Sequence, residues 1–142
     1  MTVNARPTHV QIVAVLALLW NLAGLWSFWY HLTATPETIA GWAPEQQAAF
    51  AAMPRWVFVP FAVGTVGGVL GSLGLLLGRR WAAPVFLLSL LGIVVNFSGY
   101  YLTTPAWRLS GPQGALFPLV IALAGLSLWV YARRGAARGW LR

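Results

Sequence analysis

Four long stretches of this chain contain no Asp, Glu, Lys or Arg, and this feature restricts its fold more than any other. A helix needs roughly 20 apolar residues to cross a bilayer, so each stretch can span one, the fourth near the lower limit of length. We expect an all-α fold, a bundle of four transmembrane helices forming a single membrane domain over residues 1–142. The predicted spans are residues 10–32, 56–78, 81–103 and 115–132, with an outer loop at residues 33–55.

The composition supports a lipid-facing surface. Charged residues make up 8% of the chain, whereas soluble domains have about 25%. The absence of cysteine excludes disulfides and thiolate metal sites. The net charge of +7 could indicate nucleic-acid binding, but the arginines lie between apolar spans and not on one basic face, so we expect no nucleic-acid partner.

The first apolar stretch could also be a secretory signal peptide, with Arg6 as its basic segment. The stretch is longer than the usual apolar part of a signal peptide, and no clear Ala-x-Ala cleavage pattern follows it. We therefore expect a retained transmembrane helix.

The arginines predict the orientation. Arg55 and Arg108, together with the acids Glu37 and Glu45, fall on one side of the predicted membrane. Cytoplasmic loops carry the excess of positive charge, so the other side is predicted to be cytoplasmic and to hold both termini. The arginines on that side are Arg6, Arg79, Arg80, Arg133, Arg134, Arg138 and Arg142.

The outer loop has the pattern of two short helices. Thr35 precedes Pro36 and Glu37, which is typical of an N-cap, a proline at the first helical position and an acid in the first turn. Pro44 begins a second segment that Pro54 ends. We expect a lid lying on the outer membrane face; a packed cap on the bundle and a partner-binding surface are the alternatives.

One face of the second span is rich in glycine. At 100° per residue these glycines fall within an arc of about 120°. Repeated G-x-x-x-G spacing allows a second helix to approach closely, either within the chain or between two copies. A ligand groove is the minor alternative. The predicted helix-packing residues are Gly64, Gly67, Gly68, Gly71, Gly74 and Gly78.

A few polar side chains lie within or at the edge of the spans and form the candidate polar site: Asn21, His31, Ser89 and Asn96. Polar groups in lipid need partners, so these faces should point inward. Asn21 and Asn96 could bond each other, a backbone carbonyl or a bound solute. One histidine is too few for a metal site, which needs three or four ligands. We expect no catalytic residue, metal or cofactor.

The two halves share short motifs. Asn21 and Gly24 in the first span match Asn96 and Gly99 in the third, and an arginine pair follows both the second and fourth spans. This pattern favours two helical hairpins in parallel repeat, although apolar helices also resemble one another by chance.

Several local motifs between residues 20 and 102 resemble a family of small four-helix bacterial inner-membrane proteins whose members often carry the label "sugar transporter". The resemblance implies a bacterial inner membrane and a multi-pass topology, and it carries over no functional residue. The motifs are Trp20-Asn21-Leu22-Ala23-Gly24, Thr35-Pro36-Glu37, Pro44-Glu45-Gln46, Met53-Pro54-Arg55-Trp56, Gly67-Gly68-Val69-Leu70-Gly71-Ser72, Leu75-Leu76-Leu77, Arg80-Trp81-Ala82 and Phe86-Leu87-Leu88-Ser89-Leu90.

Three functional hypotheses follow. The first is a non-catalytic membrane protein that acts through helix association, as an accessory subunit or a homo-oligomer, and the glycine face motivates it. The second is an oligomeric carrier of small polar, sugar-like solutes, motivated by Asn21, Asn96 and a heavy aromatic belt at the outer side. The third is an enzyme acting on lipid or quinone, which lacks a base, a nucleophile and a metal set.

Overall fold

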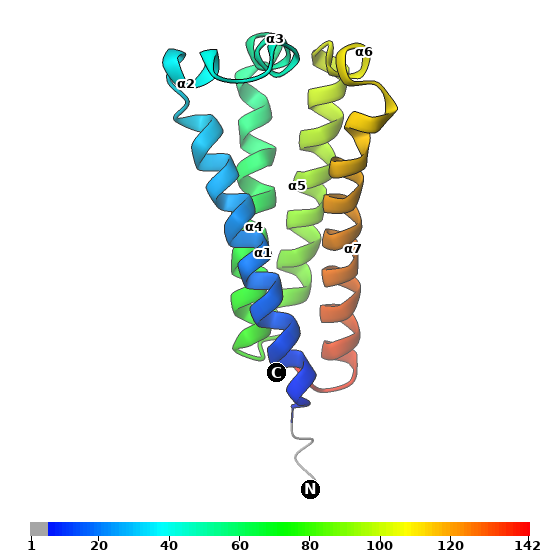
Figure 1. The fold of residues 1–142 in the computed structure, drawn as a ribbon. Coiled ribbons are helices and arrows are strands. Elements are labelled where there is room, and N and C mark those ends of the chain that lie inside the picture. Colours follow the sequence, from blue (N-terminus) through cyan, green and yellow to red (C-terminus); the bar gives the residue numbers. More distant parts are fainter. Residues whose placement is uncertain (1–5) are drawn as a thin grey trace, which may run out of the picture.

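A computed structural model describes residues 6–142, and every regular element in that part of the chain is a helix (Figure 1). Four of the helices are long and apolar enough to cross a membrane, which confirms the predicted all-α class and the four apolar spans. These helices are α1 (Thr8–Leu32), α4 (Phe58–Leu76), α5 (Ala82–Thr103) and α7 (Leu116–Ala137), with a short 3-10 helix, η1 (Arg55–Val57), before α4.

The short helices gather at one end, which we call the loop end; it is at the top of Figure 1. They are α2 (Pro36–Ala40), α3 (Pro44–Ala52), α6 (Ala106–Ser110) and the 3-10 helix η2 (Pro112–Ala115). The first two match the helices predicted in the outer loop, whereas α6 and η2 were not predicted. We call the opposite end, which carries Arg6, the α4–α5 turn and Arg142, the arginine end.

Three of the long helices begin in the same way. Pro60, Pro84 and Pro118 are the third residues of α4, α5 and α7. Proline lacks an N–H, and in the first turn of a helix that N–H has no intrahelical partner in any case. The end of α7 differs from the prediction: the helix continues past residue 132 to Ala137, because a charged residue ends an apolar window but does not end a helix.

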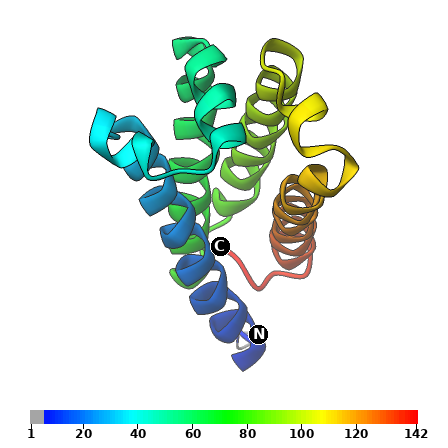
Figure 2. The same ribbon diagram turned by 45° about the horizontal axis from the view of Figure 1, so that its top comes forward.

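The long helices are arranged as a curved row. α1 packs on α4, α4 on α5, and α5 on α7, as Figure 2 shows. At the arginine end, side chains of all four long helices and of the C-terminal segment form one apolar core. Its members are Val10, Ala14, Leu75, Ala82, Phe86, Ala132 and Leu141.

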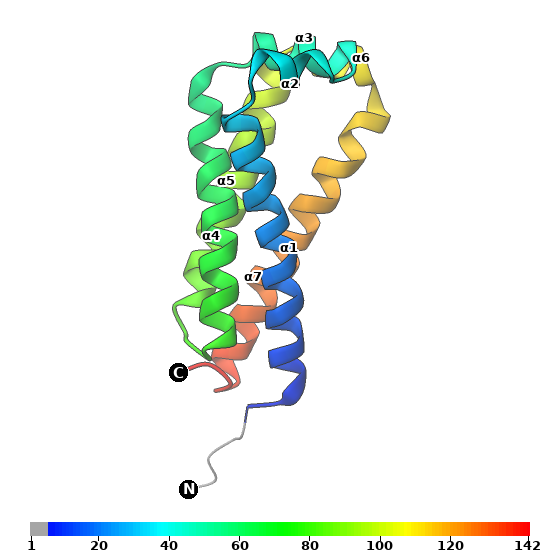
Figure 3. The same ribbon diagram turned by 60° about the vertical axis from the view of Figure 1, so that its left-hand side comes forward.

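The two outer helices of the row, α1 and α7, meet at the arginine end and diverge toward the loop end (Figures 1 and 3). Near their junction the ring of His9 lies 6.3 Å from that of Tyr131 and 5.0 Å from that of Trp140, centroid to centroid. Within residues 6–142 the four long helices therefore pack together at the arginine end, whereas α1 and α7 are separated at the loop end.

The prediction that Gly78 is a helix-packing residue is wrong. Gly78 lies beyond the end of α4 with φ of +69°, a left-handed conformation that glycine adopts without strain. Its N–H donates to Leu75 O (3.1 Å), and the N–H of Arg79 donates to Gly74 O (2.7 Å). This is a Schellman cap. Gly78 is thus a turn residue that ends α4, and not a helix-packing residue.

The end of α7 repeats this cap. Gly139 has φ of +76°, its N–H donates to Ala136 O, and the N–H of Trp140 donates to Gly135 O (2.9 Å). The arginine pairs that motivated the predicted repeat are placed differently, however. Arg79 follows the cap glycine, whereas Arg133 lies within α7.

Candidate functional site

The glycine face of α4 is covered by neighbouring side chains of the same chain. A Cβ atom at Gly67 would lie 3.1 Å from the Cβ of Ser89 on α5. At Gly71 a Cβ would lie 2.7 Å from the Phe86 ring, and at Gly74 it would lie 2.7 Å from the Trp81 ring. The glycines therefore make room for α5.

The closest approach is between the backbones of α4 and α5. A Cβ at Gly92 would lie 2.7 Å from the backbone nitrogen of Gly64 and 2.9 Å from the carbonyl oxygen of Pro60. On the other flank of the same face, Gly68 accommodates the Asn21 side chain of α1, which a Cβ would overlap. The small-residue face predicted for association is consequently used inside one chain.

Asn21 bonds α1 to α4. Its Nδ2 donates to the carbonyl oxygen of Ala17 (2.8 Å) and to Ser72 Oγ (3.2 Å). Ser72 is fully buried, and its hydroxyl donates to the carbonyl oxygen of Gly68 (2.7 Å). The amide thus fills the space that Gly68 leaves and hydrogen-bonds across the α1–α4 contact.

Ser89 bonds α5 to α4, and Asn96 bonds α5 to η1, directly before α4. The Ser89 hydroxyl donates to the carbonyl oxygen of Gly64 (2.5 Å). Asn96 Nδ2 donates to the carbonyl oxygen of Val57 (3.1 Å), which precedes α4. Both side chains are buried. Each satisfies a donor that would otherwise be unpaired in an apolar surrounding.

The four predicted polar residues therefore do not form one site. Asn21 contacts α4 at Gly68, whereas Asn96 contacts the chain at Val57. At 1.5 Å per residue these contacts are about 17 Å apart along the helix. Of the alternatives left open by the sequence, Asn96 takes the backbone carbonyl and Asn21 takes a serine hydroxyl together with a carbonyl of its own helix.

His31 belongs to an aromatic cluster at the loop end. Its Nδ1 lies 2.7 Å from the carbonyl oxygen of Ser27, to which a protonated Nδ1 donates. Its ring centroid lies 5.4 Å from that of Trp42 and 6.3 Å from that of Phe61. The full cluster is Phe28, Tyr30, His31, Trp42, Phe50, Phe58 and Phe61.

This aromatic cluster fastens the segment α2–α3, which we call the cap, to α1 and α4. Trp42 Nε1 donates to the Tyr30 hydroxyl (3.0 Å), and Gln47 Nε2 donates to the carbonyl oxygen of Trp42 (2.8 Å). At the start of the cap, the backbone N–H of Glu37 and the Thr35 hydroxyl hold the pKa of the Glu37 carboxyl below its usual range. The cap is fixed by packing and is not a free loop.

No family model, curated protein or solved structure matches the chain. The family resemblance described above stays a prediction. Within residues 6–142, no three His, Asp or Glu side chains are grouped so that they could hold a metal ion.

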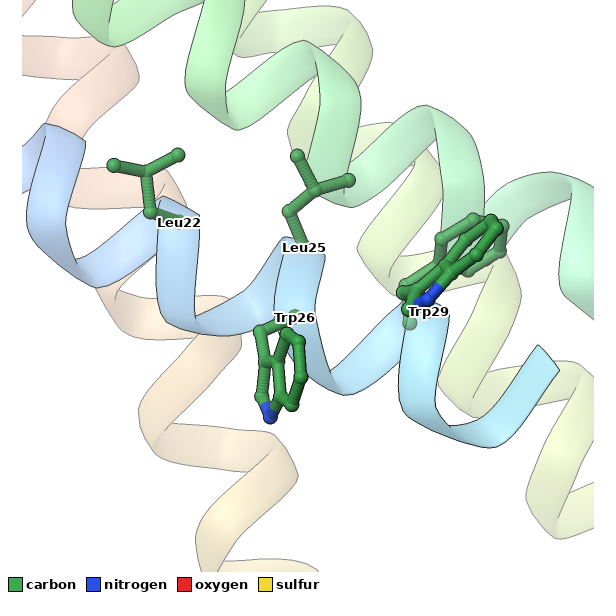
Figure 4. Close-up of a pocket in the computed structure, with 5 residues that line it drawn as sticks. Leu22, Leu25, Trp26 and Trp29 are labelled. Carbon is green, nitrogen blue, oxygen red and sulfur yellow. The ribbon is translucent and has the colours of Figure 1, made fainter. Parts of the chain in front are cut away.

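The surface of α1 carries a shallow apolar depression of about 390 Å³. Figure 4 shows Leu22, Leu25, Trp26 and Trp29 on α1 around it. Phe28 completes the lining, so every lining side chain belongs to one helix. The depression offers apolar contact to a lipid chain or a neighbouring helix, and it has no polar group suited to catalysis.

Proposed function

We propose that this chain is a non-catalytic multi-pass membrane protein that acts through helix association, as an accessory subunit of a membrane complex or as a homo-oligomer. One contrast carries the proposal. In the apolar windows of α4 and α5, 50% and 39% of the residues are buried, against 11% in α1 and 6% in α7. Two of the four long apolar helices, α1 and α7, thus have few residues that are fully buried within the chain.

The surface proposed for association is the pair of faces along which α1 and α7 diverge. Leu16 lies two helical turns from His9 on α1, and Val120 lies three turns from Tyr131 on α7, so each shares the face of the residue at the junction. We call the set Leu16, Trp20, Phe117 and Val120 the open flank. Their exposed fractions are 62%, 43%, 68% and 51%.

The orientation proposed from the arginines fits this arrangement. The seven arginines that the sequence assigns to one side all belong to the arginine end, and Glu37 and Glu45 lie in the cap at the loop end. The positive-inside rule then puts the arginine end in the cytoplasm and the cap outside. The resemblance noted above adds the bacterial inner membrane to the proposal; residues 1–5 lie outside the described part of the chain.

The alternative, a carrier for small polar solutes, depended on Asn21 and Asn96 lining one site. Their amide groups bond locally at separate depths of α4. No contact within residues 6–142 favours a polar path over association, so we retain association as the proposal.

Native mass spectrometry of the protein extracted gently from its own membrane tests the proposal. We expect a complex, either with other polypeptides or between copies. A protein that stays monomeric at every loading, in the mildest extraction that keeps known complexes of the same membrane intact, would contradict it.

A further inference from the structure

The arginine end concentrates positive charge without a carboxylate side chain to balance it. Glu37 and Glu45 are the chain's only acidic side chains, and both lie at the loop end. Arg79, Arg80, Arg134 and Arg142 are exposed at the arginine end. An excess of charge of one sign at one end of the molecule attracts groups of the opposite charge from outside the chain.

Backbone bonds hold three of these arginines together. The N–H of Arg142 donates to the carbonyl oxygen of Gly78 (2.8 Å), and the N–H of Arg80 donates to the main-chain carboxylate oxygen of Arg142 (3.0 Å). Arg79 lies between Gly78 and Arg80 in the same turn. The C-terminal segment is thereby paired with the α4–α5 turn, so that the backbones of Arg79, Arg80 and Arg142 are neighbours. We call these three arginines the turn patch.

Most guanidinium N–H groups of the turn patch donate no hydrogen bond within residues 6–142. Arg6 donates to the carbonyl oxygen of Leu76 (2.7 Å), so it serves the end of α4. Arg80 donates to the carbonyl oxygen of Ala136 (3.3 Å) through one nitrogen. Within residues 6–142 no hydrogen bond engages the guanidinium groups of Arg79 and Arg142, whose N–H forks match the oxygen atoms of a phosphate.

Apolar side chains stand beside the turn patch. Leu77, which immediately precedes the turn, is 66% exposed, and Trp81, which ends it, is 43% exposed. A ligand that carries both a phosphate and an alkyl chain meets both surfaces. A soluble phosphate would leave Leu77 and Trp81 uncovered, and a soluble acidic peptide would have to enter the headgroup layer, because Arg79 follows a membrane-spanning helix within three residues of its end.

We propose that the turn patch binds the phosphate headgroup of an anionic phospholipid, with its acyl chains against Leu77 and Trp81. The proposal rests on the membrane placement put forward above and is independent of association. The tight Gly78 turn holds Arg79 and Arg80 at the membrane surface, and the pairing with Arg142 supplies a third guanidinium from the other end of the chain.

The test uses the full chain in nanodiscs that contain phosphatidylglycerol and phosphatidylcholine in equal amounts, followed by native mass spectrometry of the released protein and its retained lipids. We expect phosphatidylglycerol to be retained in preference to phosphatidylcholine. Removing two arginines near an anionic surface should lower this preference about 30-fold.

The variant is Arg79→Gln with Arg142→Gln, and the matched control is Arg55→Gln with Arg108→Gln at the loop end. The single variant Arg79→Lys should keep only part of the preference for phosphatidylglycerol. Lysine retains the charge but lacks the two parallel N–H groups of the arginine guanidinium. Melting temperatures of the variants confirm folding, and the preference of the unaltered chain is measured in the same nanodiscs and does not depend on the variants.

Three results would overturn the proposal. They are equal retention of both lipids by the unaltered chain, an equal loss in the loop-end control, and displacement of the lipid by millimolar inorganic phosphate, which would indicate a site for a free anion. An acidic polypeptide that stays on the turn patch in phosphatidylglycerol nanodiscs would also replace this account. None of these results bears on complex formation, which the extraction experiment measures separately.

Discussion

The central pair α4–α5 and the outer helices α1 and α7 differ in how they are held. Between α4 and α5 the backbones approach at Gly64 and Gly92, and two buried side chains, Ser89 and Asn96, donate to backbone carbonyls across the contact. Within residues 6–142, one interhelical side-chain hydrogen bond holds the apolar span of α1, that of Asn21 with Ser72. Since lipid is as apolar as leucine, close backbone packing and hydrogen bonds decide which helices form the core.

The central pair and the outer helices also use their apolar surfaces differently, the former for packing within the chain and the latter for contact with the surroundings. Small residues on α4 allow another helix of the same chain to come close, whereas the large exposed side chains of α1 and α7, such as Trp20 and Phe117, face outward. The glycine pattern, which the sequence offered as the motive for association, therefore belongs to the interior. The case for association now depends on the outer helices.

The largest expected effect comes from adding a methyl group to the central contact. In Gly92→Ala the new Cβ would meet the backbone of α4 at under 3 Å, and backbone cannot move aside as a side chain can. We expect a loss of about 3 kcal/mol, at the upper end of overpacking effects. Reversible unfolding in mixed micelles measures it.

The matched control for that change is Gly24→Ala on α1. A Cβ there would lie 3.6 Å from Thr65 Cγ2, which is an ordinary contact. We expect no loss, or a small gain from the better helix propensity of alanine. Equal losses at both positions would remove the distinction between the central pair and the outer helices.

A smaller effect is expected from detaching the cap. Trp42→Ala removes the ring that contacts His31 and Phe50 and the hydrogen bond to Tyr30. We expect about 2 kcal/mol of local destabilisation, less than the roughly 3–5 kcal/mol of a fully buried tryptophan, because Trp42 is only partly buried. Hydrogen exchange should accelerate in α2 and α3 while α5 stays protected.

The exchange experiment has its own control in Trp107→Ala, since Trp107 is 53% exposed and lies on α6, outside the aromatic cluster. If exchange in α2 and α3 rose equally in both variants, or in neither, the cluster would not be what fixes the cap.

The smallest expected effect concerns one hydrogen bond. Ser89→Ala removes the donor to Gly64 O between α5 and α4, and we expect a loss of about 1 kcal/mol. Ser127→Ala removes a donor to Leu123 O within α7 itself, and there we expect a change near zero. The same unfolding measurement compares the two; a larger loss at Ser127 would argue against α4–α5 as the better-bonded pair.

Charge and hydropathy predicted the four spans, and the pattern Thr35-Pro36 predicted the start of α2, because both features act locally. The role of Gly78 was missed, although glycine directly before Arg79 at the end of an apolar run is a known sign of a helix C-cap. This C-terminal capping role accounts for Gly78 without a packing partner.

The grouping of Asn21 with Asn96 could not be decided from the sequence. Their partners depend on which face of α4 each neighbouring helix covers and at what depth, and apolar helices carry little information on either. The divergence of α1 and α7 is equally absent from the pattern, because residues 10–32 and 115–132 carry no charged side chain whether or not a neighbour covers them.

Site-specific photo-crosslinking in intact membranes tests the central claim most directly. A photoreactive residue placed at Leu16 or Phe117 on the open flank is compared with one at Leu88 on α5, which is 56% exposed. We predict crosslinks to a polypeptide, either a second copy or a partner, at the two flank positions, and crosslinks to lipid alone at Leu88. Polypeptide crosslinks of equal yield at Leu88, or crosslinks to lipid alone at all three positions, would contradict the account.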